Sequence, residues 1–206
     1  MAMSSNEHKT RRQFIGAALA GSVAMMSDAV DARAQTRAGP TPACGDASGF
    51  TPEQTEGPYF KLSSPLRASL IEPGMPGTRI IVEGRVLGTD CRPITRALFD
   101  AWQADDRGRY DNAGFRLRGH QFTDDAGRYR LETVVPGLYP GRTRHIHVKV
   151  QAPGQPVLTT QLYFPGEPEN QRDFIWSREL VMKVRAADGG KLGTFDFVLD
   201  VRGSGA

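Results

Sequence analysis

The sequence has few of the residues from which many metal centres and interaction surfaces are built. Among its 206 residues are only two cysteines and four histidines. One of the histidines, His8, lies in a segment that we expect to be removed, so a third histidine ligand beside the pair described below would have to be His120. Lysine and arginine number 26 against 23 acidic residues. This near balance gives no reason to expect binding to nucleic acid.

The sequence also lacks a hydrophobic run long enough to cross a membrane. Its main apolar stretch, 14–26, has 13 residues, whereas a spanning helix needs roughly 20. The segment Thr-Arg-Arg-Gln-Phe-Ile at 10–15 precedes that stretch and resembles the twin-arginine export motif, and Ala-Arg-Ala at 32–34 offers a cleavage site. Residues 1–34 are therefore predicted to be a signal peptide, with a periplasmic or secreted product and no stable membrane anchor. Because this route carries folded proteins, it suits a chain that takes up a cofactor first.

The two cysteines lie beyond the predicted signal. Cys44 and Cys91 both occur in loop-like sequence, and an oxidising compartment favours their pairing. The sequence therefore predicts a disulfide between Cys44 and Cys91 that fixes the N-terminal arm to the domain.

The remaining residues predict one all-β domain with an extended N-terminal arm. Residues 35–76 are rich in proline, glycine, serine and threonine and form the arm. Residues 77–206 contain short β-branched or aromatic segments separated by turn residues, which predicts a β-sandwich or barrel, and we expect a single sandwich. The predicted strands are 79–87, 97–104, 127–135, 144–151, 157–164, 179–184 and 194–201. A helical turn is expected within 167–176, and no internal repeat occurs.

Two histidines point to a metal. His145 and His147 are two residues apart in a strand-like segment, so their side chains should leave the same face. Zinc, copper and iron all accept imidazole, so the pair by itself does not name the metal. Tyr110 and Tyr129 each follow an Asp-Gly turn. Composition alone gives neither tyrosine a role as a ligand.

Four motifs in order resemble the intradiol ring-cleavage dioxygenases, the family of protocatechuate 3,4-dioxygenase and catechol 1,2-dioxygenase. They are Trp-Gln-Ala at 102–104 with Gly-Arg-Tyr-Asp-Asn at 108–112, Pro-Gly-Leu-Tyr-Pro at 136–140, Arg-Thr-Arg-His-Ile-His at 142–147, and Gln-Leu-Tyr-Phe at 161–164. The resemblance extends from about Thr55 to the C-terminus. It implies a non-haem Fe(III) cofactor and an aromatic diol and O2 as substrates.

The resemblance also assigns roles to single residues. It implies that the metal ligands are Tyr110, Tyr139, His145 and His147, with Tyr139 and His147 axial and the other two equatorial beside a hydroxide. Phenolate is a hard anionic donor suited to trivalent iron. Tyr139 would leave the metal and take a proton from the diol, so it counts as catalytic as well.

Further residues are expected around the substrate. The resemblance implies that Arg142 lies near the reacting ring, where a fixed cation would stabilise developing negative charge, and that Gln161 accompanies it. Trp102 is expected to form a pocket wall. Tyr59, in the Gly-Pro-Tyr segment of the arm, is expected to contact the substrate, although docking of its ring on the core explains it equally well. Cleavage between the two hydroxylated carbons would give a cis,cis-muconate.

The chain also departs from the familiar members. Only six residues separate Tyr139 from His145, and Gly141 stands where protocatechuate 3,4-dioxygenase has a tryptophan. The chain has no room for the helical dimerisation domain of catechol 1,2-dioxygenases. The choice of catechol and the oligomeric state, including a homo-oligomer, therefore stay open.

Two other functions compete with ring cleavage. A non-catalytic secreted β-sandwich that binds a partner would fit the fold, and a zinc hydrolase could use His145, His147 and an acidic residue. The first has no use for two tyrosines and two histidines at one point. The second leaves Tyr110, Tyr139 and Arg142 without a role.

Overall fold

The computed structural model describes residues 49–201, and they form the predicted all-β sandwich. The strands are β1 (Arg79–Gly88), β2 (Leu98–Trp102), β3 (Arg118–Phe122), β4 (Arg128–Val134), β5 (His145–Gln151), β6 (Leu158–Tyr163), β7 (Lys183–Ala187), β8 (Gly190–Thr194) and β9 (Phe197–Leu199). Two short 3-10 helices, η1 (Pro168–Gln171) and η2 (Arg178–Leu180), follow β6.

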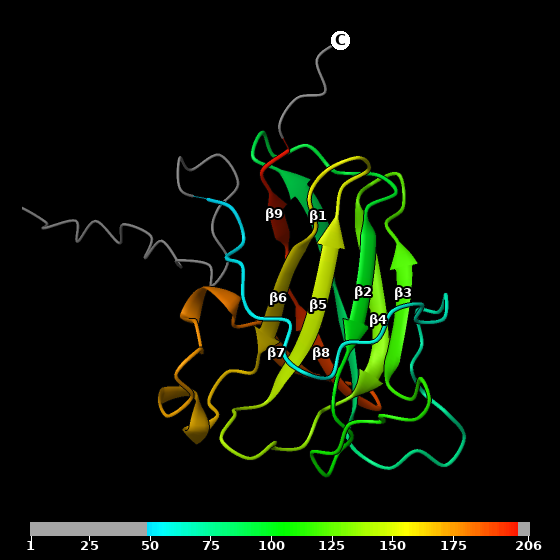
Figure 1. Ribbon diagram of the computed structural model, residues 1–206, viewed down its shortest axis with the longest axis vertical. Coiled ribbons are helices and arrows are strands. Elements are labelled where there is room, and N and C mark those ends of the chain that lie inside the picture. Colours follow the sequence, from blue (N-terminus) through cyan, green and yellow to red (C-terminus); the bar gives the residue numbers. More distant parts are fainter. Residues whose placement is uncertain (1–48, 202–206) are drawn as a thin grey trace, which may run out of the picture. The chain divides into compact units, whose positions relative to one another are not determined.

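The strands form two sheets packed face to face. One sheet has the order β3-β2-β5-β6 and is antiparallel throughout. The other has the order β4-β1-β8-β7, and β9 also pairs with β1. Figure 1 shows the first sheet in front of the second. The core lies between them because alternate residues of each strand point inward.

Alternation within the strands decides which residues fill this core. In β5, Ile146, Val148 and Val150 are fully buried, and in β2 Phe99 faces the same interior. Phe99 stacks on Tyr129 of the opposite sheet, with ring centroids 4.2 Å apart. The residues between these, including both histidines of β5, must therefore point to the outer face of the β3-β2-β5-β6 sheet.

Residues 49–78 lie along the domain as an arm. The backbone N–H of Thr51 donates to Val198, that of Gln54 to Thr159 and that of Leu70 to Glu132. Figure 1 shows the arm crossing in front of β6, β5 and β2. The outer face of the front sheet is thus covered by the arm.

The structure corrects several predicted elements. β3 and β8 were not expected, because Arg-Gly-His-Gln-Phe and Gly-Lys-Leu-Gly-Thr contain glycine and few β-branched residues. The strand expected at 179–184 begins only at Lys183, since residues 178–180 form η2. The strand expected at 194–201 is limited to β9. The helical turn expected within 167–176 is present as the 3-10 helix η1.

Three predictions involve residues outside 49–201. The signal peptide and the start of the arm lie there, as does Cys44. Its expected partner Cys91 is not a free thiol. Within 49–201 no helix is long and apolar enough to span a bilayer.

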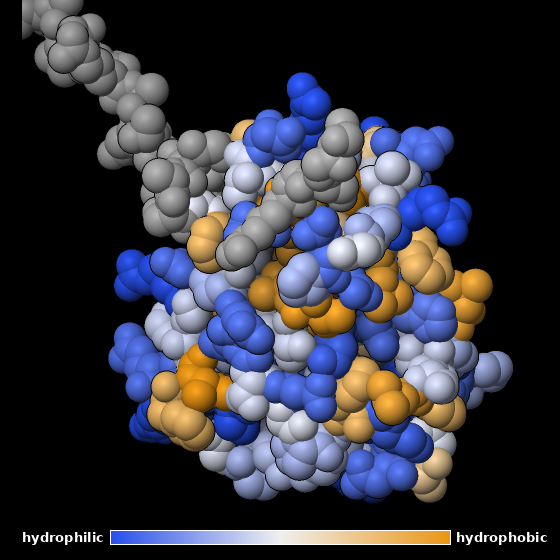
Figure 2. Space-filling view, turned by 45° about the horizontal axis from the view of Figure 1, so that its top comes forward, coloured by the Kyte–Doolittle hydropathy of each residue, from blue (hydrophilic) through white to orange (hydrophobic). Residues whose placement is uncertain are grey.

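Exposed apolar side chains do not form one broad surface on the face that Figure 2 shows. There they occur as small patches separated by polar side chains. The most exposed are Phe174, Leu62 and Leu66, at 89%, 78% and 70%.

Candidate metal centre and active site

The two histidines of β5 form the base of the site. His145 and His147 are both buried, and their Nε2 atoms are 3.1 Å apart. Nδ1–H of His145 donates to the carbonyl of Thr143 at 2.7 Å. That bond leaves the Nε2 lone pair of His145 directed into the site.

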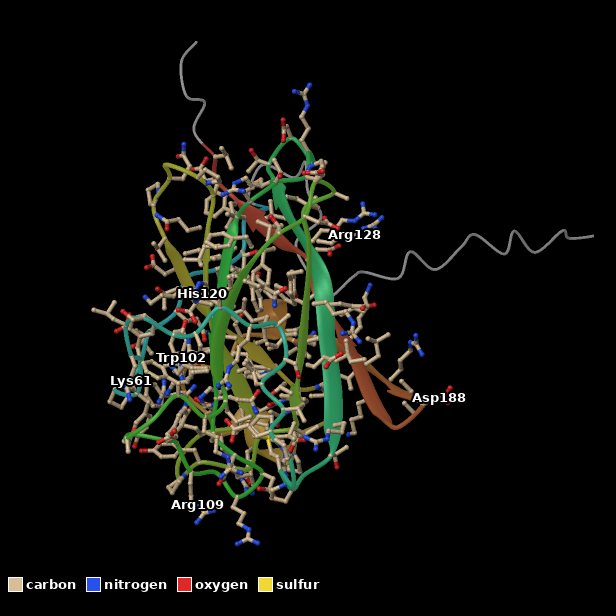
Figure 3. The ribbon with its side chains drawn as sticks, turned by 90° about the vertical axis from the view of Figure 1, so that its right-hand side faces the viewer. Lys61, Trp102, Arg109, His120, Arg128 and Asp188 are labelled. Atoms are coloured by element: carbon tan, nitrogen blue, oxygen red, sulfur yellow. The ribbon has the colours of Figure 1, made fainter. Side chains whose placement is uncertain are left out.

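Strand register places a row of further side chains beside them. Trp102 on β2 pairs with His147 on β5, which pairs with Gln161 on β6, and Arg118 on β3 pairs with Trp102. Directly opposed residues share a face of the sheet, so all four side chains project outward. The indole of Trp102 stacks on the imidazole of His147, with centroids 4.9 Å apart and planes at 6°. In Figure 3, Trp102 and His120 lie on this side of the molecule and Asp188 lies on the other.

The arm covers the row from outside. Gly57 has φ +72°, and a Cβ there would lie 3.2 Å from Cε1 of His147. Two residues later the ring of Tyr59 stacks on Tyr110, with centroids 4.2 Å apart. An ion pair of 2.6 Å between Glu56 and Lys149 joins the arm to β5. Close passage of the backbone over an imidazole explains why glycine stands at position 57.

The two loops that carry Tyr110 and Tyr139 touch through glycines. A Cβ on Gly108, whose φ is +78°, would lie 1.9 Å from the carbonyl oxygen of Leu138. The backbone N–H groups of Gly108 and Gly137 both donate to the carbonyl of Asp105, at 3.0 and 2.7 Å. The Asp-Gly turn and the Pro-Gly-Leu-Tyr-Pro turn are therefore packed against each other, which brings their tyrosines together.

Tyr110 reaches the histidines directly, and Tyr139 lies next to Tyr110. The hydroxyl of Tyr110 is 3.3 Å from Nε2 of His145. The ring of Tyr139 lies 5.9 Å from that of Tyr110, and its hydroxyl shares a 2.7 Å hydrogen bond with the hydroxyl of Tyr59. The four residues that the sequence nominated as ligands thus occupy one pocket, with Tyr59 beside them.

Arg118 ties these loops to the sheet. Its side chain is buried, and it donates to the carbonyl of Tyr59 at 2.5 Å and to that of Asp111 at 3.0 Å. Burial lowers the pKa of this guanidinium. A single cation therefore fixes the backbone next to both stacked tyrosines.

Burial favours the neutral forms of the two histidines and of Tyr110. It lowers the pKa of His145 to about 4 and that of His147 well below its usual value. It raises the pKa of Tyr110, while the hydrogen bond with Tyr139 raises that of Tyr59. Neutral imidazoles are the form that binds metals, and a buried phenol ionises only next to a strong positive charge.

The geometry fits a single ion. Two ligand atoms that each lie about 2 Å from one ion at roughly right angles are about 3 Å apart, and the separations of 3.1 and 3.3 Å around Nε2 of His145 match this. Nδ1 of His147 is buried and has no hydrogen-bond partner within residues 49–201. Residues 49–201 contain no cluster of three or more His, Cys, Asp or Glu side chains that could hold a metal. The zinc hydrolase hypothesis thus finds no third ligand of that kind in this part of the chain.

Arg142 lies beside this pocket and is held from two sides. Its Nη2 donates to Oε1 of Gln161 at 2.6 Å, and its Nε donates to Oδ2 of Asp173 at 2.8 Å. Nε2 of Gln161 donates in turn to the carbonyl of Thr55 in the arm, at 3.0 Å. The resemblance implied that Gln161 accompanies Arg142, and the two side chains form a direct hydrogen bond.

Several contributors were missed from the sequence. Asp173 and Arg118 were given no role, because nothing in their spacing marks them, and Thr143 and Thr55 lie in recognised segments but were given no role of their own. The only signal for Asp173 was the polar run at 169–173 before Phe-Ile-Trp, which indicated only a helical turn.

Four residues outside the proposed ligand set have structural contacts, three of them hydrogen bonds. His120 bonds through Nδ1 to the carbonyl of Ser64 at 2.7 Å, and Tyr129 donates to a buried carbonyl at 2.8 Å. Tyr163 donates to Gln54 at 2.6 Å and so helps to hold the arm. Trp176 packs against the core.

Two hollows lie near the arm and the tyrosine loop. One of about 640 Å³ is lined by residues 50–53, 155–158 and 198–200 with Glu179, and it includes none of the candidate ligands. The other, of about 450 Å³, is lined by Tyr110 and its neighbours Asp105, Arg109, Asp111, Arg116 and Leu117. We take the cluster of Tyr110, Tyr139, His145 and His147 as the candidate site, because the volume of a hollow does not by itself supply a reactive group.

The described residues thus form a β-sandwich that brings two phenols and two imidazoles together on the outer face of one sheet. Comparison with known proteins makes this specific. A family model described as Dioxygenase (Dioxygenase_C) matches residues 55–201. The chain belongs to the intradiol dioxygenase family.

Individual relatives agree with this assignment. The chain is 33% identical to catechol 1,2-dioxygenase 2 of Acinetobacter lwoffii over 68% of its own length and 61% of that protein. It is 31% identical to the protocatechuate 3,4-dioxygenase beta chain of Burkholderia cepacia, over 70% and 74%. The chain thus spans about three fifths of the length of the first of these.

A solved structure is also similar. The dioxygenase domain of a dioxygenase carbohydrate-binding protein fusion from Streptomyces sp. SirexAA-E is 60% identical. The match covers 74% of this chain and 99% of that one, with a TM-score of 0.73. Hydroxyquinol 1,2-dioxygenase of Pseudomonas putida DLL-E4 is 25% identical, over 76% and 68%, with a TM-score of 0.68.

Proposed function

We propose that this protein is an iron(III) dioxygenase that cleaves a catechol-type ring between its two hydroxylated carbons with O2, giving a cis,cis-muconate-type product. The observation that carries the proposal is the convergence of Tyr110 and Tyr139 with His145 and His147. Family membership supports it, because the relatives named above are ring-cleaving dioxygenases of catechol-type diols.

The residues present fit ferric iron and would hold it. Two phenolates supply two negative charges to a trivalent ion, and two neutral imidazoles complete the set without adding charge. When bound, the ion would supply the positive charge that holds the diol as a dianion and makes its ring reactive toward O2. With the hydroxide that the resemblance implies as a further ligand, the negative charges would balance the trivalent ion, which would avoid an unpaired charge in a buried pocket.

The protein's own groups would handle protons and charge. The oxygen of Tyr139 would accept a proton from a hydroxyl of the incoming diol, and the hydroxyl of Tyr59, 2.7 Å away, would hold that oxygen by a hydrogen bond. The guanidinium of Arg142 would stabilise negative charge developing on the ring and so lower the barrier. Trp102, stacked on His147, would form one wall of the pocket.

Colour provides the test of this proposal. Tyrosinate bound to ferric iron absorbs visible light, so the iron-loaded protein should be red to brown and should change colour with catechol under anaerobic conditions.

Tyr110→Phe should weaken the colour and iron binding. Arg142→Ala should keep the colour and lose most turnover, which a panel of catechol, protocatechuate and hydroxyquinol would follow by oxygen uptake. A colourless protein with one zinc per chain would refute the proposal and favour the hydrolase or the binding module.

The cellular location is part of the proposal. The twin-arginine-like motif at 10–15 supports export of the folded, iron-loaded protein to the periplasm or beyond. Replacing both arginines with lysine should leave the protein in the cytoplasm, and fractionation of cells would show it.

A further inference from the structure

The carboxylate of Asp173 lies behind Arg142 and is fully buried. Its side chain has 0% exposure, against 15% for Arg142. Oδ2 accepts hydrogen bonds from Nε of Arg142 at 2.8 Å and from the backbone N–H of Thr143 at 3.0 Å. Oδ1 accepts from the backbone N–H of Ile175 at 3.2 Å. Both carboxylate oxygens therefore accept hydrogen bonds. The backbone N–H groups of Thr143 and Ile175 hold the carboxylate in place independently of the guanidinium.

The second contact of Arg142 completes a clamp on one edge of the guanidinium. Nη2 donates to Oε1 of Gln161, whose other side-chain atom, Nε2, donates to Thr55 in the arm. The hydroxyl oxygen of Tyr163, whose proton goes to Gln54, lies 3.2 Å from Oε1 of Gln161. A guanidinium is planar, so two bonds along one edge fix its plane. Gln161 sits on β6 and Asp173 in the loop after η1, so the clamp has two independent supports.

We infer that Asp173 is a positioning residue of this site: it acts through Arg142 and fixes the direction in which the guanidinium faces the reacting ring. The inference rests on the proposed function, which gives Arg142 its task. Arginine has many rotamers, and a cation that must reorient during the reaction stabilises the transition state less than one already in place. A buried carboxylate holds Nε in one position.

Asp173 differs from its neighbour Asn170 in one decisive respect. Asn170 is buried in the same loop, and its Oδ1 accepts from Oγ1 of Thr143 at 2.7 Å. Its Nδ2 donates to the carbonyl of Phe164 at 2.9 Å. Asn170 and Asp173 both accept hydrogen bonds from Thr143, but within residues 49–201 only Asp173 of the two accepts one from Arg142. Asn170 therefore serves as a matched control for the stability of the loop.

The variant Asp173→Asn tests the inference in the full, iron-loaded chain. The asparagine amide carries no charge. If its oxygen takes the place of Oδ2, its NH2 group faces the backbone N–H of Ile175, so two donors oppose each other and the contact with Arg142 weakens. Loss of a charge-assisted hydrogen bond predicts a fall in kcat of roughly 10- to 100-fold, with KM for catechol changed less than about threefold because the interaction acts in the transition state. The visible absorption of the ferric centre should stay as in the wild type.

Two comparisons separate positioning from mere support of the loop. Asn170→Ser should lower the melting temperature at least as much as Asp173→Asn and keep kcat within about threefold of the wild type. The double variant Asp173→Asn with Arg142→Ala should be no slower than Arg142→Ala alone, because both changes remove the same effect. An equal loss of kcat in Asn170→Ser, or additive losses in the double variant, would overturn the inference.

A readout without turnover keeps the inference separate from the proposed function. In the 15N-labelled full chain without iron, Nε–H of Arg142 should exchange slowly with solvent, and it should exchange fast in Asp173→Asn. Fast exchange in the wild type would refute the clamp whatever the activity. If the wild type cleaved no catechol while Nε–H stayed protected, the proposed function would fail and the clamp would stand.

Discussion

Acid should destabilise the metal-free protein through His145. This imidazole is 4% exposed, and burial lowers its pKa to about 4 from the usual 6.5. Above about pH 6.5 both the folded and the unfolded chain hold it neutral, so it costs nothing. Between about pH 6.5 and 4 the unfolded chain binds a proton that the folded chain does not. Stability is therefore fully present above that window and falls as the pH falls through it.

The pKa difference fixes the size of the effect. The gap between about 4 and 6.5 corresponds to about 3 kcal/mol once the window is crossed. Between about pH 7 and about pH 5 the expected loss of unfolding free energy from this residue alone is about 2 kcal/mol. Burial also lowers the pKa of His147 well below its usual value, so His147 adds a loss of the same sign.

Denaturant unfolding of the metal-free chain at both pH values measures this loss, with His145→Gln as the control. The variant removes one titrating group and leaves every carboxylate and His147 in place. The drop in unfolding free energy from about pH 7 to about pH 5 should be smaller in the variant by about 2 kcal/mol. Equal drops in the two proteins would show that His145 titrates normally and that the site is not dry.

Three further substitutions test how the arm and core support the site. Gly57→Ala should cost roughly 1–2 kcal/mol for the positive φ alone and weaken iron retention, because the new Cβ meets His147 at 3.2 Å; denaturant unfolding and metal analysis measure both. Glu56→Gln should cost less than about 1 kcal/mol, since the carboxylate facing Lys149 is 45% exposed, and the loss should shrink in high salt. Tyr129→Phe should cost about 1 kcal/mol in thermal unfolding without altering colour, because its hydroxyl bonds a buried carbonyl far from the ligands.

Local composition determined much of the fold. Short segments rich in β-branched residues and bounded by turn residues, 79–87 and 144–151, predicted β1 and β5 almost to the residue. This signal was missing for β3 and β8, which contain Gly119 and Gly193, and there pairing with neighbouring strands creates the strand. Pairing energy comes from the partner strand, which a single segment does not reveal.

The sequence by itself determined which residue types this site offers: two phenols in glycine-rich turns, two imidazoles on one strand face, and an arginine three residues before them. Only the tertiary structure decided how they are held. Asp173 meets Arg142 across 31 positions, and Tyr59 meets Tyr139 across 80. Spacing along a chain fixes geometry only within one element, whereas contacts between distant loops depend on how both sheets and the arm pack together.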